Sequence, residues 1–230
     1  MKTLGLIGGM SWESTVSYYR LINEGIKQRL GGLHSAKLLL SSVDFATIAE
    51  LQRAGDWDEA GRQLAEEARR LQGAGAELLV LATNTMHLVA PAIEAATAIP
   101  LLHIVDPTGA ALRAASIDCV GLLGTRFTME QDFYRGRLES MHGLRVITPA
   151  QPARERVHQV IFDELCLGRI EEDSRRDYLD IVAQLQAAGA QAVILGCTEI
   201  GLLLRQSDCA LPLFDTTALH AQAAVDAMLA

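Results

Sequence analysis

The chain has 230 residues, of which 50% are hydrophobic and 5% aromatic, and its formal net charge is −8 at pH 7. This length suits a globular protein of two small lobes, and the negative charge argues against nucleic acid or an anionic membrane surface as a partner. No apolar run approaches the roughly 18 residues of a membrane span, and Met1–Thr3 run straight into a strand. We therefore expect a cytoplasmic protein without a signal peptide or a membrane partner.

The cysteine pattern also favours a cytoplasmic protein. The chain has four cysteines, without a CxxC pair or zinc-ligand spacing, and the histidines are scattered, so we expect no metal site. A reduced, cytoplasmic compartment is the simplest setting for such a chain. The cysteines are Cys119, Cys166, Cys197 and Cys209.

In the first half, aliphatic runs of strand length alternate with longer amphipathic segments. The expected strands are residues 4–7, 37–43, 78–81 and 100–104. The expected helices are residues 12–30, 58–75, a helix ending near residue 97, and residues 106–115, with residues 44–57 as a loop containing short helical turns.

Candidate functional residues follow two of the expected strands in this half. Gly8 and Gly9 turn the chain after the first strand, but the phosphate-loop patterns GxxxxGK[ST] and GxGxxG are both absent. After the third strand come Thr83, Asn84 and Thr85. Asn84 and Thr85 are expected at a helix N-terminus, where N–H groups and side chains would bind a substrate carboxylate.

The second half repeats the alternation. Strands are expected at residues 119–123, 145–148, 192–195 and near 213, with helices from about residue 129, over 152–167, over 174–188 and at the C-terminal end. Thr125 and Thr128 follow the first of these strands, and they either bind substrate or cap the next helix.

Cys197 follows a strand that breaks at Gly196. Thr198 is expected to be the N-cap of a helix with Glu199 in its first turn. A thiol at such a helix start has its thiolate stabilised by backbone N–H groups, so we expect a lowered pKa for Cys197. The alternative is a small buried core cysteine.

Three pairs of segments favour an internal duplication of about half the chain. Residues 5–10 resemble residues 121–126, the segment around Thr83 resembles the one around Cys197, and residues 100–108 resemble residues 211–216. Two facing half-domains would place Thr83 and Cys197 on opposite walls of one cleft, able to act on both faces of a single carbon.

Alternating strands and helices predict an α/β fold of two pseudo-symmetric, flavodoxin-like or Rossmann-like lobes with parallel sheets. The expected lobes are residues 1–98 with about 211–230, and residues 99–210. Ligands bind such sheets at the carboxyl ends of the strands, and all the motifs named above lie there.

These motifs together resemble those of the cofactor-independent aspartate/glutamate racemases, over nearly the whole chain. The resemblance rests on Gly5–Thr15, Thr83–His87, Leu123–Met129 and Gly196–Glu199. The family usually has a cysteine where Thr83 stands, so the chain is most similar to an enterobacterial subgroup with a Thr/Cys pair.

The resemblance implies a homodimer acting on a small amino-acid substrate. It places Thr83 and Cys197 as catalytic residues. It further implies substrate contacts at Met10, Gln52, Asn84, Thr85, Thr125, Thr128 and Thr198.

We expect a pyridoxal-phosphate-independent racemase that interconverts L- and D-aspartate or glutamate. Only three lysines are present, and none follows a predicted strand in a motif, so no Schiff-base cofactor is expected: Lys2, Lys27 and Lys37. Cys197 as thiolate would remove the α-proton of the L-enantiomer, and Thr83 would deliver a proton to the opposite face. Asn84, Thr85 and Thr198 would stabilise the carbanion through the α-carboxylate. Conversion from the L side should be faster, because a hydroxyl is a poorer base than a thiolate.

Other assignments remain open. A broad-specificity racemase of neutral amino acids, such as homoserine, is one, because neither Arg53 nor Arg126 clearly marks a site for a distal carboxylate. Hydantoin racemases, maleate isomerases and arylmalonate decarboxylases have related scaffolds centred on cysteine. A non-catalytic amino-acid-binding protein, with Thr83 marking a degraded site, belongs to a different class.

Overall fold

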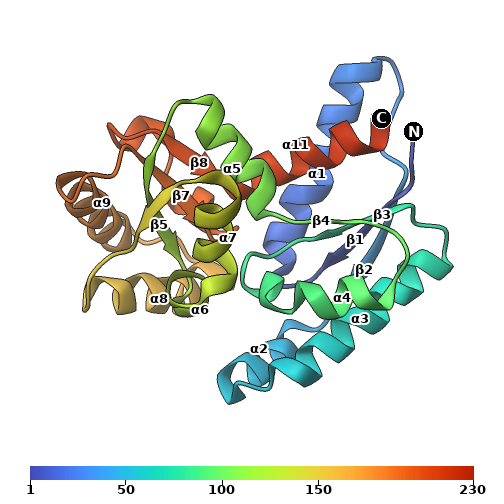
Figure 1. Ribbon diagram of the computed structural model, residues 1–230, viewed down its shortest axis with the longest axis horizontal. Coiled ribbons are helices and arrows are strands. Elements are labelled where there is room, and N and C mark those ends of the chain that lie inside the picture. Colours follow the sequence, from blue (N-terminus) through green and yellow to red (C-terminus); the bar gives the residue numbers. More distant parts are fainter. The chain divides into compact units, whose positions relative to one another are not determined.

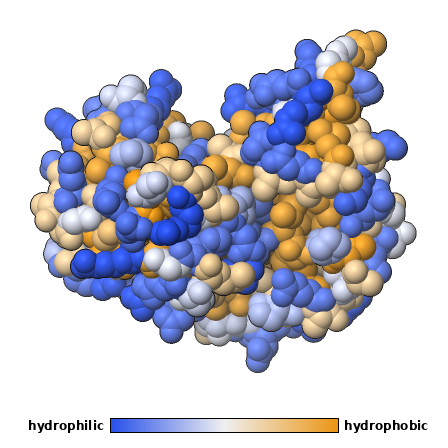
Figure 2. Space-filling view, turned by 45° about the horizontal axis from the view of Figure 1, so that its top comes forward, coloured by the Kyte–Doolittle hydropathy of each residue, from blue (hydrophilic) through white to orange (hydrophobic).

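The computed structural model describes all residues from 1 to 230, and the chain divides into two compact units (Figure 1). Unit 1 comprises residues 1–104 and 220–230, and unit 2 comprises residues 105–219. Each unit is a four-stranded parallel sheet flanked by helices. Polar and apolar residues are interspersed over the visible surface (Figure 2).

Unit 1 has the strand order β2-β1-β3-β4, with all neighbours parallel. The strands are β1 (Leu4–Gly8), β2 (Leu38–Ser42), β3 (Leu78–Leu81) and β4 (Leu101–Leu102). The helices are α1 (Trp12–Leu30), α2 (Phe45–Ala54), α3 (Trp57–Gly73), the 3-10 helix η1 (Thr85–Val89), α4 (Ala90–Ala96) and the second part of α11 (Thr216–Leu229).

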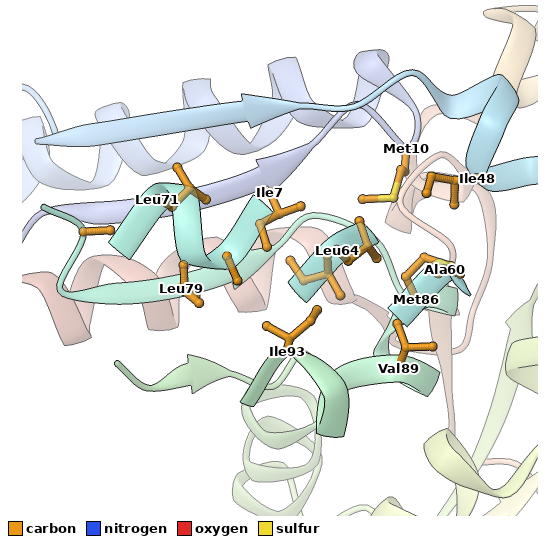
Figure 3. Close-up of a cluster of buried hydrophobic side chains, with 13 residues drawn as sticks. Ile7, Met10, Ile48, Ala60, Leu64, Leu71, Leu79, Met86, Val89 and Ile93 are labelled. Carbon is orange, nitrogen blue, oxygen red and sulfur yellow. The ribbon is translucent and has the colours of Figure 1, made fainter. Parts of the chain in front are cut away.

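The core of unit 1 lies on both faces of this sheet, because successive strand side chains point to opposite faces. On one face Leu6 and Val80 pack with α1 and α11, through residues such as Ile22 and Val225. On the other face Ile7, Leu79 and Leu81 pack with α3 and α4 (Figure 3). Strands buried on both faces explain why β1 and β3 are continuous aliphatic runs in the sequence.

Unit 2 has the strand order β6-β5-β7-β8, again all parallel. The strands are β5 (Cys119–Gly124), β6 (Arg145–Ile147), β7 (Ala192–Gly196) and β8 (Leu213–Asp215). The helices are α5 (Val105–Ala114), α6 (Arg126–Glu130), α7 (Asp132–His142), α8 (Ala153–Asp163), η2 (Leu165–Leu167), α9 (Glu172–Ala187), α10 (Ile200–Leu203), η3 (Gln206–Asp208) and the start of α11.

The two sheets share one topology, as a duplication predicts. In chain order each unit's strands are arranged second, first, third, fourth across the sheet. Gly5 and Gly121 also play the same part. A Cβ built on Gly5 would meet Leu71 of α3 at 3.2 Å, and one built on Gly121 would meet Leu185 of α9 at 2.9 Å. Both positions therefore need glycine for a helix to lie close to the central strand.

The predicted α/β class, with two parallel-sheet lobes, is confirmed, but several boundaries differ. The units meet at residues 104/105 and 219/220, later than the predicted 98/99 and 210/211. The reason is strand pairing: β4 completes the first sheet beside β3, and β8 completes the second beside β7. The predicted loop at residues 44–57 is largely the helix α2, capped by Asp44. No helix combines the length and apolarity that crossing a membrane would need.

Candidate active site

The first strand end of unit 1 is a close-packed turn. Gly9 has φ +93°, and a Cβ there would lie 2.2 Å from the Val43 carbonyl oxygen. The Gly9 N–H donates to Thr15 Oγ1 at 2.8 Å, and that hydroxyl donates to the Ser11 carbonyl at 2.9 Å. The turn is thus held by its own helix start.

Met10 follows Gly9 in this turn, and its side chain is only 3% exposed. It lies in the same apolar cluster as Ile48 and Met86 (Figure 3). The side chain of Met10 is therefore a core group, so a substrate contact at this position would have to use its backbone.

Gln52 lies on α2 and is 3% exposed. Its Nε2 contacts Met86 Sδ at 3.0 Å, and its Oε1 is buried without a hydrogen-bond partner. A buried, unpaired amide oxygen is costly unless something binds it. Gln52 is therefore a predicted substrate residue of unit 1 with a buried acceptor that no protein group uses, and its contact with Met86 places it one residue from the Thr83–Thr85 segment.

Thr83, Asn84 and Thr85 follow β3 and are all buried. Asn84 and Thr85 lie at a helix start, as expected, but the helix is the 3-10 helix η1, and Asn84 occupies its N-cap position without a capping bond from its side chain. The backbone of Thr83 is held instead by His87, whose Nδ1 lies 2.7 Å from the Thr83 carbonyl oxygen. The Ile104 N–H donates to His87 Nε2 at 3.2 Å. Because a carbonyl can only accept, His87 is a neutral imidazole with its proton on Nδ1.

His87 belongs to a buried group of rings. Its ring centroid lies 4.6 Å from that of His103 and 5.9 Å from that of His220. His220 Nε2 donates to the Leu102 carbonyl, and its Nδ1 accepts from the Tyr18 hydroxyl, both at 2.9 Å. Burial lowers the pKa of His220 to about 3. These histidines are structural core groups, and no group of three His, Cys, Asp or Glu side chains is arranged to hold a metal ion.

In unit 2, Thr125 and Thr128 follow β5. Thr125 is the N-cap of α6, accepting from the Thr128 N–H at 3.3 Å, and the two hydroxyl oxygens are 3.2 Å apart. The capping alternative is therefore observed. Gly124 and Gly196 bring the ends of β5 and β7 together, since a Cβ on Gly196 would lie 2.7 Å from the Leu123 carbonyl.

Cys197 lies directly after β7 and is 8% exposed. Its Sγ donates to Glu199 Oε2 at 2.8 Å, and the Thr198 hydroxyl donates to the same oxygen at 2.8 Å. The helix that follows, α10, begins only at Ile200 and has four residues. Thr198 is therefore not the N-cap, and Glu199 itself occupies that position, without a side-chain capping bond.

The electrostatics of Cys197 also differ from the prediction. Burial raises the pKa of the Cys197 thiol well above its ordinary value, and the nearby Glu199 carboxylate raises it further. The expected lowering of this pKa is wrong, because the helix start is one short turn and the nearest charge is negative. Glu199 was missed as a site residue, although the spacing Cys-x-Glu was the available signal.

Neither arginine considered for a distal carboxylate is buried. Arg53 is exposed on α2, where its Nε donates to the Ala49 carbonyl at 3.2 Å. Arg126 is exposed, with its guanidinium carbon 5.6 Å from the Phe127 ring centroid.

The structure thus groups the predicted residues within each unit. Met10 and the Thr83–Thr85 segment follow β1 and β3, and Gln52 of α2 joins them through its contact with Met86. Thr125 and Thr128 follow β5, and Cys197 and Thr198 follow β7. The residues that follow these strands lie at the carboxyl ends of the central strands, where ligands bind in open parallel sheets.

Comparison with known proteins places this arrangement in a family. Residues 7–224 match the family model of the Asp/Glu/hydantoin racemases. The chain is 23% identical to the broad specificity amino-acid racemase RacX of Bacillus subtilis (strain 168), over 99% of this chain and 98% of that protein. The chain belongs to the Asp/Glu/hydantoin racemase family, and the predicted enzyme class, isomerase, is confirmed at that level.

Solved structures agree. A crystal structure of a Yersinia pestis protein, named as a candidate Asp/Glu racemase, has 56% identity and a TM-score of 0.93, with full coverage of both chains. An aspartate racemase homologue from Pyrococcus horikoshii OT3 has 30% identity and a TM-score of 0.86, also with full coverage. A glutamate racemase from Francisella tularensis shares the fold, at 15% identity and a TM-score of 0.67, over 99% of this chain and 81% of that one.

Proposed function

We propose that the protein is a pyridoxal-phosphate-independent racemase of aspartate and glutamate, with Cys197 and Thr83 as its two proton-transfer residues. The observation that carries the proposal is their equivalence. Thr83 follows β3 and Cys197 follows β7, the same strand in two sheets of identical order. Each unit would thus contribute one proton-transfer group to the reaction at the α-carbon of the substrate.

Racemisation then needs two proton transfers and one anion site. Cys197, as thiolate, removes the α-proton of the L-enantiomer: the C–H bond breaks, an S–H bond forms, and the electron pair stays on the α-carbon. Thr83, directly or through a water molecule, gives a proton to the opposite face. Asn84, Thr85 and Thr198 are the proposed donors to the α-carboxylate, where charge accumulates in the transition state.

A broad-specificity racemase of neutral amino acids is the second candidate. It is favoured by the exposure of Arg53 and Arg126, because a distal carboxylate usually needs a cationic or bidentate partner inside the site. The printed name of the Bacillus subtilis relative points the same way for that protein. In this case the buried Oε1 of Gln52 would accept from a polar group of the substrate.

Exchange of the α-proton in D₂O, followed by proton NMR, tests both candidates. L-aspartate, L-glutamate and a panel of neutral L-amino acids, including homoserine, are incubated with the natural protein and with Cys197→Ala. We expect the natural protein to catalyse exchange and Cys197→Ala to catalyse none. The substrate that exchanges fastest then distinguishes a racemase of acidic amino acids from one of broad specificity. Binding of an amino acid without exchange would favour a non-catalytic binding protein instead.

We further propose that the protein works in the cytoplasm as a homodimer. Trp12, Val16 and Tyr19 support the dimer, because they lie on one face of α1 and are 64%, 56% and 55% exposed. Exposed apolar residues at this helical spacing are typical of a surface that another chain covers.

A further inference from the structure

Cys197 and Glu199 form a buried thiol–carboxylate pair. Cys197 is 8% exposed and Glu199 is 2% exposed, and 2.8 Å separates Sγ from Oε2. Thr198 donates its hydroxyl to the same oxygen, at 2.8 Å. One carboxylate oxygen thus accepts two side-chain donors, and both come from the segment that directly follows β7.

A single negative charge on such a pair is stable, whereas a second negative charge is strongly unfavourable. Two anions at hydrogen-bond distance in a buried site repel each other strongly, so the second ionisation of the pair is suppressed. In this structure Sγ is the donor and Oε2 the acceptor of the hydrogen bond, so the proton lies on the thiol. A protonated thiol cannot accept an α-proton, so its own proton has to leave before the reaction.

We propose that Glu199 takes the proton of the Cys197 thiol and so generates the thiolate that acts on the substrate. This inference rests on the proposed function, and it makes Glu199 a positioning residue that holds a proton for Cys197. The proton moves from Sγ to Oε2 along the existing hydrogen bond: the S–H bond breaks and an O–H bond forms. The pair keeps a single negative charge during this transfer, so the site avoids the unfavourable doubly charged state.

The other titratable groups that face Cys197 cannot take this part. Tyr178 of α9 donates its hydroxyl to the Val157 carbonyl at 2.9 Å, and burial raises its pKa. Cys166 of η2 is itself a thiol and offers no stronger base than Cys197. Glu199 is the acceptor that already holds the hydrogen bond.

Glu199→Gln is the central test, because glutamine keeps the size and a hydrogen-bond acceptor but cannot take a proton. Glu171→Gln is the matched control, since Glu171 is exposed on the same unit and loses the same charge. Glu199→Asp keeps the acid on a shorter stem and should restore the natural behaviour in part. Thermal unfolding of each variant verifies that it is folded.

The first readout needs no substrate. Iodoacetamide alkylation of Cys197 is measured by peptide mass spectrometry from pH 6 to pH 10, which separates it from the three other cysteines. In the natural protein we expect a rate that changes little around neutrality, because the proton stays within the pair. In Glu199→Gln we expect a rate that rises about tenfold per pH unit, slower than the natural protein at low pH and faster at high pH.

A different role for Glu199 gives a different result. If Glu199 only suppresses the thiolate as a fixed negative charge, Glu199→Gln would be alkylated faster at every pH, and the inference would be overturned. Parallel pH profiles for the two proteins would overturn it as well.

The second readout is α-proton exchange of the best L-amino acid. We expect Glu199→Gln to lose about 100-fold at pH 7, with the loss shrinking as the pH rises, and Glu171→Gln to keep the natural rate. Unchanged exchange in Glu199→Gln contradicts the inference. If the natural protein exchanges no amino acid, the proposed function fails, and the alkylation profiles still decide whether the pair shares its proton.

Discussion

Thr83 and Cys197 hold equivalent positions after β3 and β7, yet they differ greatly as proton-transfer groups. A thiol ionises within reach of neutral pH, whereas a threonine hydroxyl hardly ionises at all. Under the proposed function the protein is therefore asymmetric in its chemistry although it is symmetric in its fold. The asymmetry is kinetic, because no catalyst changes the equilibrium between two enantiomers.

Replacing Thr83 by cysteine tests this asymmetry directly. We expect Thr83→Cys to raise α-proton exchange of the D-enantiomer by at least about tenfold, because a thiolate is the better base for that face. NMR of the D-amino acid in D₂O provides the measurement. Thr83→Ser, which keeps a hydroxyl, should stay near the natural rate, and an equally slow Thr83→Cys would show that Thr83 does not act on this face.

The turn after β1 offers a second prediction at the residue scale. Gly9 has φ +93° and no room for a Cβ beside the Val43 carbonyl, whereas Gly75 has φ +99° and nothing within 4 Å of its Cβ position. We expect Gly75→Ala to cost about 1 kcal/mol in the free energy of unfolding, from backbone strain alone. Gly9→Ala should cost roughly 3 kcal/mol or more, because a steric overlap adds to the strain. Urea denaturation measures both, and equal losses would contradict the overlap.

The positions of Thr83 and Cys197 just after strands could be predicted from the sequence, whereas the surroundings of the Cys197 thiol could not. The motif positions follow from strand ends and turn glycines, which are local features of the chain. The raised pKa of Cys197 does not, because it depends on burial and on the orientation of the Glu199 carboxylate. The part that His87 plays in holding the Thr83 carbonyl could not be predicted from the sequence either, because the second partner of its ring is the backbone N–H of Ile104.

At the element scale, long periodic segments were predictable and short irregular ones were not. The helix predicted at residues 12–30 is found with those bounds, because its apolar face, N-cap Ser11 and terminal Gly31 all agree. The helix α2 was missed although Asp44 and Gly55 flank it as caps, since few of its residues are buried. The helix expected after Cys197 is the single turn α10, and no feature of the local sequence predicts that it is so short.

The last helix, α11, carries a pH-dependent prediction through His220. The pKa of His220 is about 3 in the folded protein, below the ordinary value of about 6.5 in the unfolded chain. The unfolded chain therefore binds an extra proton between these values. The stability linked to His220 is fully present above pH 6.5 and is lost as the pH falls toward 3, by about 1.4 kcal/mol per pH unit.

His220→Gln should remove that dependence. Its free energy of unfolding at pH 8 should be lower than that of the natural protein, because the bonds to Tyr18 and Leu102 are disturbed. Between pH 6 and pH 4 it should fall less steeply, by about 1.4 kcal/mol per pH unit. Denaturant unfolding at several pH values measures both slopes. His34→Gln, at an exposed position, should keep the natural slope, and parallel slopes for His220→Gln would contradict the assignment.

At the scale of the whole molecule, the chain consists of two α/β units with the same strand order. The shared strand order and the paired roles of Gly5 and Gly121 follow from one pattern, so the duplication seen in the sequence organises the entire fold. The internal repeat does not predict whether two chains associate. The one local sign of such association is the apolar face of α1, formed by Trp12, Val16 and Tyr19, which the folded chain leaves exposed.

Val16→Glu tests whether that face joins two copies. A carboxylate at the centre of a buried apolar contact would lose its hydration without a partner, which costs several kcal/mol. We therefore expect the natural protein to sediment as a dimer and Val16→Glu to weaken the dimer by about 100-fold or more in dissociation constant. Leu33→Glu is the matched control, because Leu33 is fully exposed beyond the end of α1. Equal sedimentation of all three proteins would show that α1 is not the dimer surface, and a monomeric natural protein would remove the dimer itself.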